Sequence, residues 1–244
     1  MQSIKNALKK YKQELDRINE ELKTLPPGHL GKKRSYYYHI NKEKHIGITR
    51  KPKIIRQLAR KKYLLARKAQ LERNLSKPLN EFNLSTPTEI IASLPDIYKT
   101  LPESYFYHPS IEPWLANPPR KNSLNPEHAK YNSSNNIQFR SLMERIIAEV
   151  LNEYNLPYHY DALIEIGDKL VSPDFIIKNP FTGETFIWEH FGAFNQEDYA
   201  KSMNEKMNRY IENGFGPLEN LIATYEYHIR DTQRIREIIE QIIL

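Results

Sequence analysis

The sequence predicts an α/β protein in which one β-sheet is flanked by helices and preceded by a basic helical arm. Three observations carry this prediction. Residues 137–244 alternate between helical and extended hydrophobic patterns, residues 1–80 hold two helical patterns around a short hairpin pattern, and residues 81–136 are rich in proline. We therefore expect a basic arm at 1–80, a proline-rich connector at 81–136 and an α/β core at 137–244.

The arm begins with apolar residues at alternating steps of three and four, which predicts a helix packing along a seam. These residues are Leu8, Tyr11, Leu15, Ile18, Leu22 and Leu25. Residues 36–48 read as a short β-hairpin around an Asn-Lys-Glu-Lys turn, and a second helix is expected from about Lys53 to Ser76. The seam also offers a surface for a homodimer or a protein partner, although packing within the arm is favoured.

Charge is divided unevenly along the chain. Residues 1–80 hold 22 Lys/Arg and 6 Asp/Glu, whereas the remainder holds 14 Lys/Arg and 24 Asp/Glu. A basic arm beside an acidic body favours a polyanion as the partner of the arm. The residues expected to contact nucleic-acid phosphates are Arg56, Arg60, Lys61, Lys62, Arg67 and Lys68. The alternative is a basic helix pair that is merely solvated.

Composition excludes several classes of site. The chain has no cysteine, so disulfides, thiolate metal sites and cysteine nucleophiles are excluded. No apolar run approaches the roughly 20 residues of a membrane span, and the charged N-terminus lacks a signal-peptide pattern. A phosphate-binding glycine loop and a GxSxG motif are both missing from the sequence, which argues against an NTPase or an α/β-hydrolase. The protein is expected to be cytoplasmic, with no membrane partner.

The core opens with a helical stripe of apolar residues from Phe139 to Tyr154. Three extended runs follow: YHYDALIEI at 158–166, LVSPDFIIKN at 170–179 and TFIWEHFG at 185–192. A helix from Gln196 to about Glu212, a strand at 220–227 and a final isoleucine-rich helix complete the order α-β-β-β-α-β-α. This alternation predicts one sheet with helices on its faces.

Two carboxylates can meet at one end of this sheet. Side chains alternate along strands, so Asp174 and Glu189 share a face if their strands pair through the turn at Thr182-Gly183. Two carboxylates at such a short distance repel each other unless a cation lies between them, and oxygen ligands favour Mg²⁺ or Mn²⁺. Glu144, at the edge of the first helical stripe, is the third candidate ligand.

Each carboxylate also has an ordinary interpretation. Glu144 is one turn from Arg140, with which it can form a surface ion pair worth about 0.3–0.5 kcal/mol. Asp174 follows a proline at the start of a strand, and Glu189 lies near the end of one. The three together, in this order of elements, favour a metal site.

The pattern Pro173-Asp174 followed by WEHFG at 188–192 resembles the PD-(D/E)xK nuclease superfamily. WEHFG and the helix ending KMNRY at 206–210 are similar to a bacterial and phage branch whose third strand reads Trp-Glu-His-x-Gly, as is the basic arm. The resemblance implies a restriction-endonuclease-like αβββαβ core with a central mixed sheet, an N-terminal helix-hairpin-helix arm and metal-dependent hydrolysis of phosphodiester bonds. DNA is favoured over RNA, and internal cleavage over cleavage from ends.

The resemblance also implies roles for residues. Asp174 and Glu189 would bind the metal with the backbone carbonyl of His190, and Glu144 would bind it directly or through water. The superfamily lysine, two residues after the glutamate, is replaced by Phe191.

Three residues can replace that lysine. Lys178 is about 13 Å from Asp174 along the strand, and the His190 side chain turns to the opposite face. Lys206 shares a helical face with Tyr210 and is favoured as the relocated catalytic lysine, with Tyr210 supporting the site. Two other functions stay open: an inactive nucleic-acid-binding module on a nuclease fold, and a protein-interaction subunit.

Overall fold

The computed structural model describes residues 2–78, 81–122, 130–133, 137–192, 197–217, 219–226 and 231–244. Side chains are described from residue 8 onward and, in the helix at 197–212, from residue 201 onward. The chain divides into two compact units, Met1–His108 and Pro109–Leu244. Residues 81–108 of the expected connector therefore belong with the arm, and residues 109–136 belong with the core.

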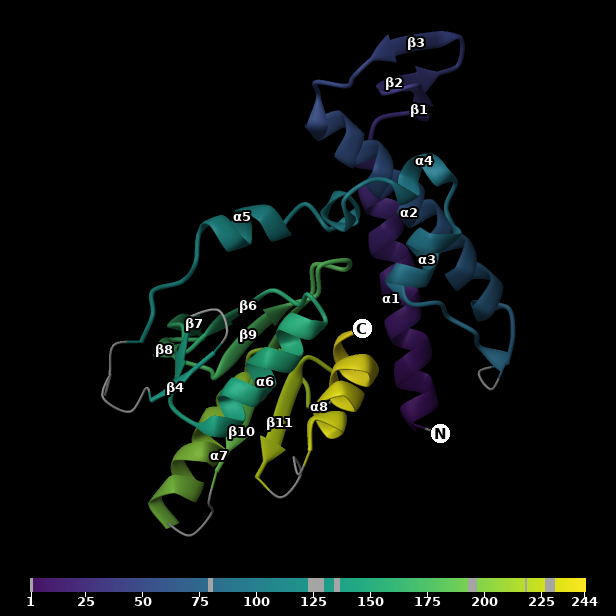
Figure 1. Ribbon diagram of the computed structural model, residues 1–244. Helices are drawn as coiled ribbons and strands as arrows, with labels where there is room; N and C mark the ends of the chain where they lie inside the picture. The colour runs from purple at the N-terminus through teal and green to yellow at the C-terminus, as the bar shows by residue number, and fades with distance from the viewer. Residues whose placement is uncertain are drawn as a thin grey trace. The chain divides into compact units, whose positions relative to one another are not determined.

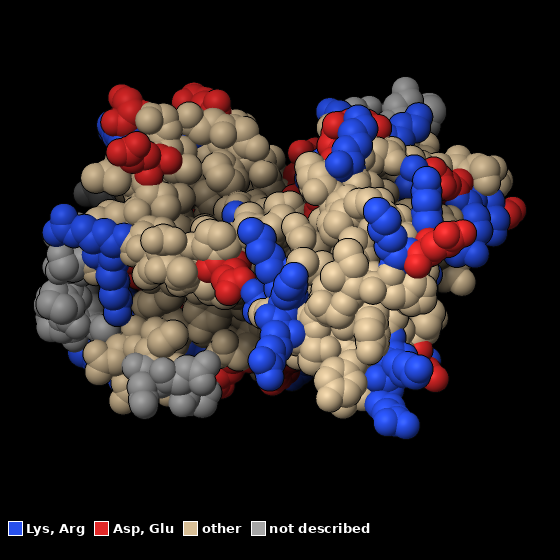
Figure 2. Space-filling view, turned by 90° about the horizontal axis from the view of Figure 1, so that it is seen from above, with Lys and Arg blue, Asp and Glu red and all other residues tan. Residues whose placement is uncertain are grey.

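The N-terminal unit pairs two long helices, α1 (Gln2–Thr24) and α2 (Pro52–Leu75), as the sequence predicts (Figure 1). Between them lies an antiparallel sheet in the order β1-β2-β3, with β1 at His29–Lys33, β2 at Tyr36–Asn41 and β3 at Lys44–Gly47. The predicted hairpin thus gains a third strand. β1 was not foreseen because its sequence, HLGKK, has only one large apolar residue. Figure 2 shows Lys and Arg side chains projecting from this unit at the end where the sheet lies.

Short helices complete the N-terminal unit. α3 (Pro87–Ser93) begins with a capping box between Thr86 and Glu89, and its Pro87 occupies the first turn, where a missing N–H costs nothing. α4 (Asp96–Lys99) and the 3₁₀ turn at Glu103–Phe106 follow. The Tyr98 hydroxyl accepts a hydrogen bond from the Leu30 N–H, which fixes α4 against β1.

The C-terminal unit is built on a four-stranded mixed sheet in the order β11-β10-β9-β6. Its strands are β6 (Tyr158–Tyr160), β9 (Phe175–Lys178), β10 (Thr185–Phe191) and β11 (Leu221–Tyr225). β10 runs antiparallel to β9 and parallel to β11, and β6 is antiparallel to β9. An α/β fold with a mixed sheet is therefore confirmed.

Three helices accompany the sheet: α6 (Leu142–Glu153), α7 (Glu197–Glu212) and α8 (Thr232–Ile238), which continues as a π-helix at Ile239–Ile243. A short helix, α5 (Ile111–Ala116), begins this unit. β4 (Tyr131–Asn132) pairs with β5 (Gln138–Phe139) just ahead of α6.

Two of the predicted strands are wrong in their extent. The run at 158–166 breaks after β6, because Asp161 has a left-handed φ of +49° that turns the chain. Residues 164–171 form a separate hairpin, β7 (Ile164–Ile166) and β8 (Lys169–Val171), around Gly167 at φ +64°. The run at 170–179 is divided between β8 and β9, which are separated by Ser172, Pro173 and Asp174.

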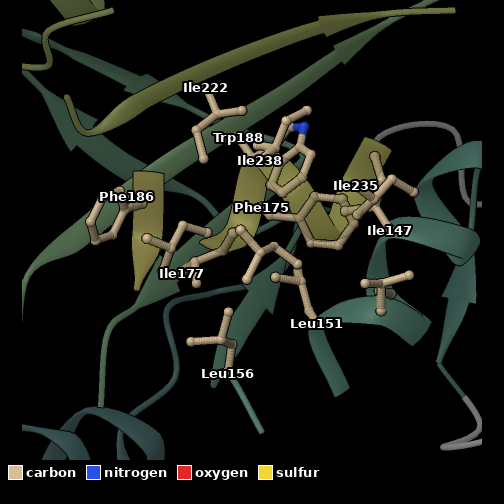
Figure 3. Close-up of a cluster of buried hydrophobic side chains, with 14 of the residues drawn as sticks. Ile147, Leu151, Leu156, Phe175, Ile177, Phe186, Trp188, Ile222, Ile235 and Ile238 are labelled. Carbon is tan, nitrogen blue, oxygen red and sulfur yellow. The ribbon is translucent and has the colours of Figure 1, made fainter. Parts of the chain in front are cut away.

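The two faces of the sheet carry different helices. Trp188 and Phe186 of β10 lie in one buried cluster with Ile147 of α6 and Ile235 of α8 (Figure 3). Ile187, the residue between them, lies in another cluster with Tyr210 of α7. Side chains alternate along a strand, so α6 and α8 cover one face and α7 covers the other. Glu189 shares its face with Ile187 and therefore points toward α7.

Every described helix is too short or too polar to cross a membrane.

Candidate metal centre

Asp174 and Glu189 are brought together by the register of β9 and β10. The last assigned pair is Phe175 with Trp188, and one further step places Asp174 opposite Glu189. The Asp174 Oδ2 accepts a hydrogen bond of 2.6 Å from the backbone N–H of His190. Asp174 is partly buried and Glu189 is 2% exposed. The two carboxylates lie at one end of the sheet, on the face expected from strand alternation.

Burial and mutual repulsion act on this pair. Burial raises the pKa of Asp174 well above its usual value, and the charges of Glu189 and Glu144 raise that pKa further, against a smaller lowering by Lys206. Burial also raises the pKa of Glu189, although Lys206 and Tyr210 oppose this shift. Among the described residues, the Asp174 carboxylate accepts only the hydrogen bond from His190, so its charge is poorly compensated.

The Glu189 carboxylate is held by two side chains of α7. The Tyr210 hydroxyl donates to Oε1 at 2.6 Å, and the Lys206 Nζ is 2.7 Å from Oε1 and 2.9 Å from Oε2. Lys206 also donates to the carbonyl of Ser172 at 2.9 Å. Burial and the Glu189 charge raise the pKa of Tyr210, which keeps its hydroxyl a donor. Lys206 therefore touches both the Glu189 carboxylate and the segment that leads into Asp174.

Glu144 lies at the third position of α6, where it closes a capping box with Ser141. Its Oε2 accepts hydrogen bonds from the backbone N–H groups of Arg140 and Ser141 and from the Tyr160 hydroxyl at 2.6 Å. The alternative role was an ion pair with Arg140, whose guanidinium lies 2.6 Å from the Asp161 carboxylate. The charge of Glu144 raises the pKa of Asp174, so Glu144 acts on the site electrostatically while its Oε2 is hydrogen-bonded at the helix cap.

The His190 side chain turns to the face opposite Glu189, as strand alternation requires. Its Nδ1 lies 3.1 Å from the Thr224 hydroxyl, which also accepts a hydrogen bond from the Trp188 indole at 2.9 Å. The backbone is oriented differently. Since the N–H and C=O of one strand residue point to the same side, the His190 carbonyl faces the Asp174 side together with its N–H.

No group of three or more His, Cys, Asp or Glu side chains is gathered to hold a metal ion within the described part of the chain. Glu144 is engaged through Oε2 at its helix cap, and the other candidate donors at this end of the sheet are Asp174, Glu189 and the His190 carbonyl. These are oxygen donors, which Mg²⁺ and Mn²⁺ prefer. A divalent cation would also neutralise the repulsion that raises the Asp174 pKa, so the donor set fits such an ion.

Sequence reasoning missed Asp161, which is 7% exposed. Its carboxylate pairs with Arg140 and accepts hydrogen bonds from the Ser172 hydroxyl at 2.6 Å and the Asn122 amide at 3.1 Å. Its N–H donates to the Asp174 carbonyl at 3.0 Å. Asp161 therefore joins the start of α6 to the segment that carries Asp174. The available signal was a charged residue inside the apolar run YHYDALIEI.

Another candidate for the missing lysine, Lys178, lies apart from the carboxylates. Lys178 is at the far end of β9, 5.7 Å from the centre of the Trp114 ring. Phe191 is 5% exposed and packs against Tyr225 with ring centres 5.5 Å apart. A lysine side chain at position 191 would have to replace this buried aromatic contact.

The basic residues expected to bind nucleic acid are mostly engaged within the arm. Arg60 is 4% exposed and donates to both oxygens of Glu21 at 2.8 Å. Arg67 donates to both oxygens of Glu14 at 2.7 and 3.0 Å. These two bidentate ion pairs join α2 to α1.

The other four candidates on α2 are also partly buried. Lys68 donates to the Asn19 side chain at 2.6 Å and Lys61 to the Pro26 carbonyl at 2.9 Å. The Arg56 guanidinium lies 5.2 Å from the centre of the Tyr105 ring. Lys62 is the remaining member of the predicted set. The helix pair is therefore held together by its basic residues, and α2 does not present them as one free face.

Comparison with known proteins identifies no family for this chain. No family model matches it, and no solved structure matches it. A segment of 82 residues, 33% of this chain, is 34% identical to the uncharacterized protein MJ1519 of Methanocaldococcus jannaschii. That segment covers 7% of the length of MJ1519, so this chain spans a small part of the relative it matches.

Proposed function

We propose that the protein is a divalent-metal-dependent nuclease with a restriction-endonuclease-like core, and that it hydrolyses phosphodiester bonds, most readily in DNA. The observation that carries this proposal is the meeting of Asp174, Glu189 and Lys206. Two carboxylates come from adjacent strands, and an ammonium from the next helix lies 2.7 Å from one of them. Apart from the inserted β7–β8 hairpin, the elements α6, β6, β9, β10, α7 and β11 follow one another in an αβββαβ order, which supports this proposal.

Asp174, Glu189 and the His190 carbonyl would hold the metal. When bound, the metal supplies charge that polarises the phosphate and lowers the pKa of the attacking water. Tyr210 holds Glu189 in orientation through its 2.6 Å hydrogen bond. Because the second α7 contact, Lys206, is an ammonium, it can orient the attacking water and balance the negative charge that develops on the phosphate.

The relocation of the lysine has support in the local sequence. Lys206 and Tyr210 are four residues apart on α7 and reach the same carboxylate, so one helix face supplies both groups. The position that the superfamily lysine would occupy is filled by Phe191, which is buried. The Lys206 side chain is 29% exposed.

A cleavage assay tests the proposal. The protein is incubated with supercoiled, linear and single-stranded DNA and with RNA, in Mg²⁺, Mn²⁺ or EDTA. We expect cleavage with either metal and none in EDTA. Glu189→Ala should abolish cleavage, whereas the matched control Glu165→Ala, an exposed glutamate of β7, should cleave as fast as wild type. Equal cleavage by the Glu189→Ala protein would refute the site.

The second candidate function is a nucleic-acid-binding module without turnover. The observation that favours it is that the described contacts already occupy both oxygens of Glu189, through Lys206 and Tyr210. A metal would then have to share the Glu189 oxygens with these donors or displace the Lys206 ammonium. Metal-independent binding of DNA with no cleavage of any substrate would support this candidate over the nuclease.

A further inference from the structure

The cations of the N-terminal unit fall into two groups that differ in their partners. On α2, Arg60 and Arg67 are bound to Glu21 and Glu14. The strands and turns of the β1–β3 sheet carry a second group, whose members are all exposed: Lys32, Lys33, Arg34, Lys42 and Lys44. None of this second group forms an ion pair with a described residue. The only acidic residue from 28 to 53 is Glu43, so the sheet keeps an uncompensated positive charge.

The two turns of the sheet expose cations at positions that do not favour them. β1 and β2 are joined by the two-residue loop Arg34-Ser35, and β2 and β3 by Lys42-Glu43. Arg34 has φ +54° and Lys42 has φ +53°. Glycine and asparagine are the usual residues at such positions, because a Cβ is strained there. Stability alone does not account for long basic side chains at both tips.

The chain leaves the sheet through a third basic segment. Arg50, Lys51 and Lys53 are exposed at the start of α2. The first turn of α2 contains no acidic residue, and its cap residue Lys51 makes no side-chain hydrogen bond to the helix. The N-terminus of a helix carries a partial positive charge, so cations there are unfavourable unless an anion is also bound.

Aromatic side chains accompany these cations. Tyr36 is 59% exposed, directly opposite Lys33 in the register. Tyr37 is opposite Lys32, whose ammonium lies 5.1 Å from the centre of the Tyr37 ring. Ammonium groups beside aromatic rings, of which Tyr36 is exposed, form a combination that can bind phosphates and stack on bases.

We propose that the three-stranded sheet β1–β3, with the first turn of α2, is the surface of the arm that binds the nucleic-acid backbone, and that the remainder of α2 is not. The identity of the ligand rests on the proposed function, whereas the location of the surface rests on charge and exposure. Lysine and arginine side chains there neutralise phosphates, and Figure 2 shows the basic side chains at this end of the unit.

The test measures binding in the absence of cleavage. Full-length protein in EDTA is titrated against a fluorescent 20-base-pair DNA, and anisotropy is followed over a series of salt concentrations. The sheet variant carries Lys32→Gln, Lys33→Gln, Lys42→Gln and Lys44→Gln. The matched control removes four exposed lysines elsewhere with the same change in net charge: Lys9→Gln, Lys12→Gln, Lys77→Gln and Lys169→Gln.

We expect the control to bind like wild type apart from a small general effect of charge. Each phosphate contact contributes a slope of about −0.9 to the dependence of log K on log salt. In the sheet variant, the loss of two such contacts weakens binding on the order of 30-fold at 0.15 M salt. Equal weakening in the two variants would refute the surface. Loss of binding to anionic lipid vesicles by the sheet variant, with DNA binding unchanged, would also refute it and would identify a lipid partner.

A thermal melt of each variant separates binding from folding. The four lysines are exposed, so the sheet variant is expected to melt with the wild type. The outcome is also independent of the proposed catalytic site. If the Glu189→Ala test finds no metal-dependent cleavage but the sheet variant still loses DNA binding, the nuclease proposal fails and the binding surface stands. If cleavage is present and the sheet variant binds DNA normally, the binding surface fails and the nuclease proposal stands.

Discussion

Replacing Lys206 with methionine removes its ammonium but keeps a side chain of similar length. In the wild type this ammonium is 2.7 Å from the Glu189 carboxylate, which is 2% exposed. At an effective dielectric constant of about 20, a separation of 2.7 Å corresponds to a gross attraction of roughly 6 kcal/mol, and desolvation of both groups offsets part of it. Breaking a buried pair by removing one partner costs about 3–5 kcal/mol, and since Lys206 is 29% exposed we expect a loss of about 3 kcal/mol at neutral pH.

The loss should depend on pH, with a sign fixed by Glu189. Burial already raises the Glu189 pKa in the folded protein, and Lys206 opposes that rise, so Lys206→Met should raise this pKa further. A carboxyl group with a raised folded-state pKa stabilises the fold below its unfolded pKa of about 4.3, and this stabilisation is lost as the pH rises through the folded-state value. The variant should therefore lose more stability, relative to wild type, at pH 8 than at pH 5.

Urea unfolding of metal-free protein at pH 5, 6, 7 and 8 measures this effect. Glu189→Gln, alone and combined with Lys206→Met, completes a double-mutant cycle that isolates the pair. We expect Lys206→Met to cost much less when residue 189 is neutral, and we expect cleavage to fall by orders of magnitude in the Lys206→Met protein. A Lys206→Met variant with wild-type stability and wild-type cleavage would refute both the ion pair and the catalytic role. Additive costs in the cycle would refute the coupling alone.

Three further variants test the roles of Asp174, Asp161 and Lys42. Asp174→Asn should stabilise the metal-free protein, because it removes a buried charge whose pKa is raised; lower stability without metal would contradict this. The same change should abolish cleavage and the increase in melting temperature that we expect Mn²⁺ to give the wild type. Asp161→Asn keeps a residue that tolerates φ +49° but weakens the contacts to Arg140 and Ser172. We expect the free energy of unfolding in urea to fall by about 1–3 kcal/mol and cleavage to become slower, whereas unchanged cleavage would separate Asp161 from the site. Lys42→Asn should stabilise the fold by roughly 1 kcal/mol in thermal or urea unfolding yet weaken DNA binding in anisotropy titrations; tighter binding would argue against the sheet surface.

Much of the fold could be predicted from local patterns in the sequence. The heptad spacing of α1 and the apolar stripe of α6 each define a helix face, because a helix repeats every 3.6 residues. The alternation in TFIWEHFG likewise divides β10 between two clusters, with Trp188 in one and Ile187 in the other. The same alternation was sufficient to expect Asp174 and Glu189 on one face, since parity along paired strands is a local property.

The predictions that failed depend on long-range partners or on single backbone angles. Asp161 breaks a run that reads as one strand, because its left-handed φ is fixed by contacts with Arg140 and Ser172. β1 exists because β2 provides hydrogen-bond partners that its own sequence does not reveal. For Glu144, the spacing Ser-x-x-Glu in the sequence indicates the capping box, whereas its hydrogen bond with the Tyr160 hydroxyl depends on the tertiary structure.

The charged residues of the arm show most clearly what the sequence determines and what the tertiary structure decides. The sequence by itself determined that residues 1–80 carry a large excess of Lys and Arg. It did not determine which cations are free, because Glu14 and Glu21 lie 53 and 39 residues before the arginines they bind. Only the pairing of α1 with α2 decided that Arg60 and Arg67 hold the arm together, leaving the lysines of the β1–β3 sheet exposed. An ion pair is a property of distance in space, and composition records the charges without their distances.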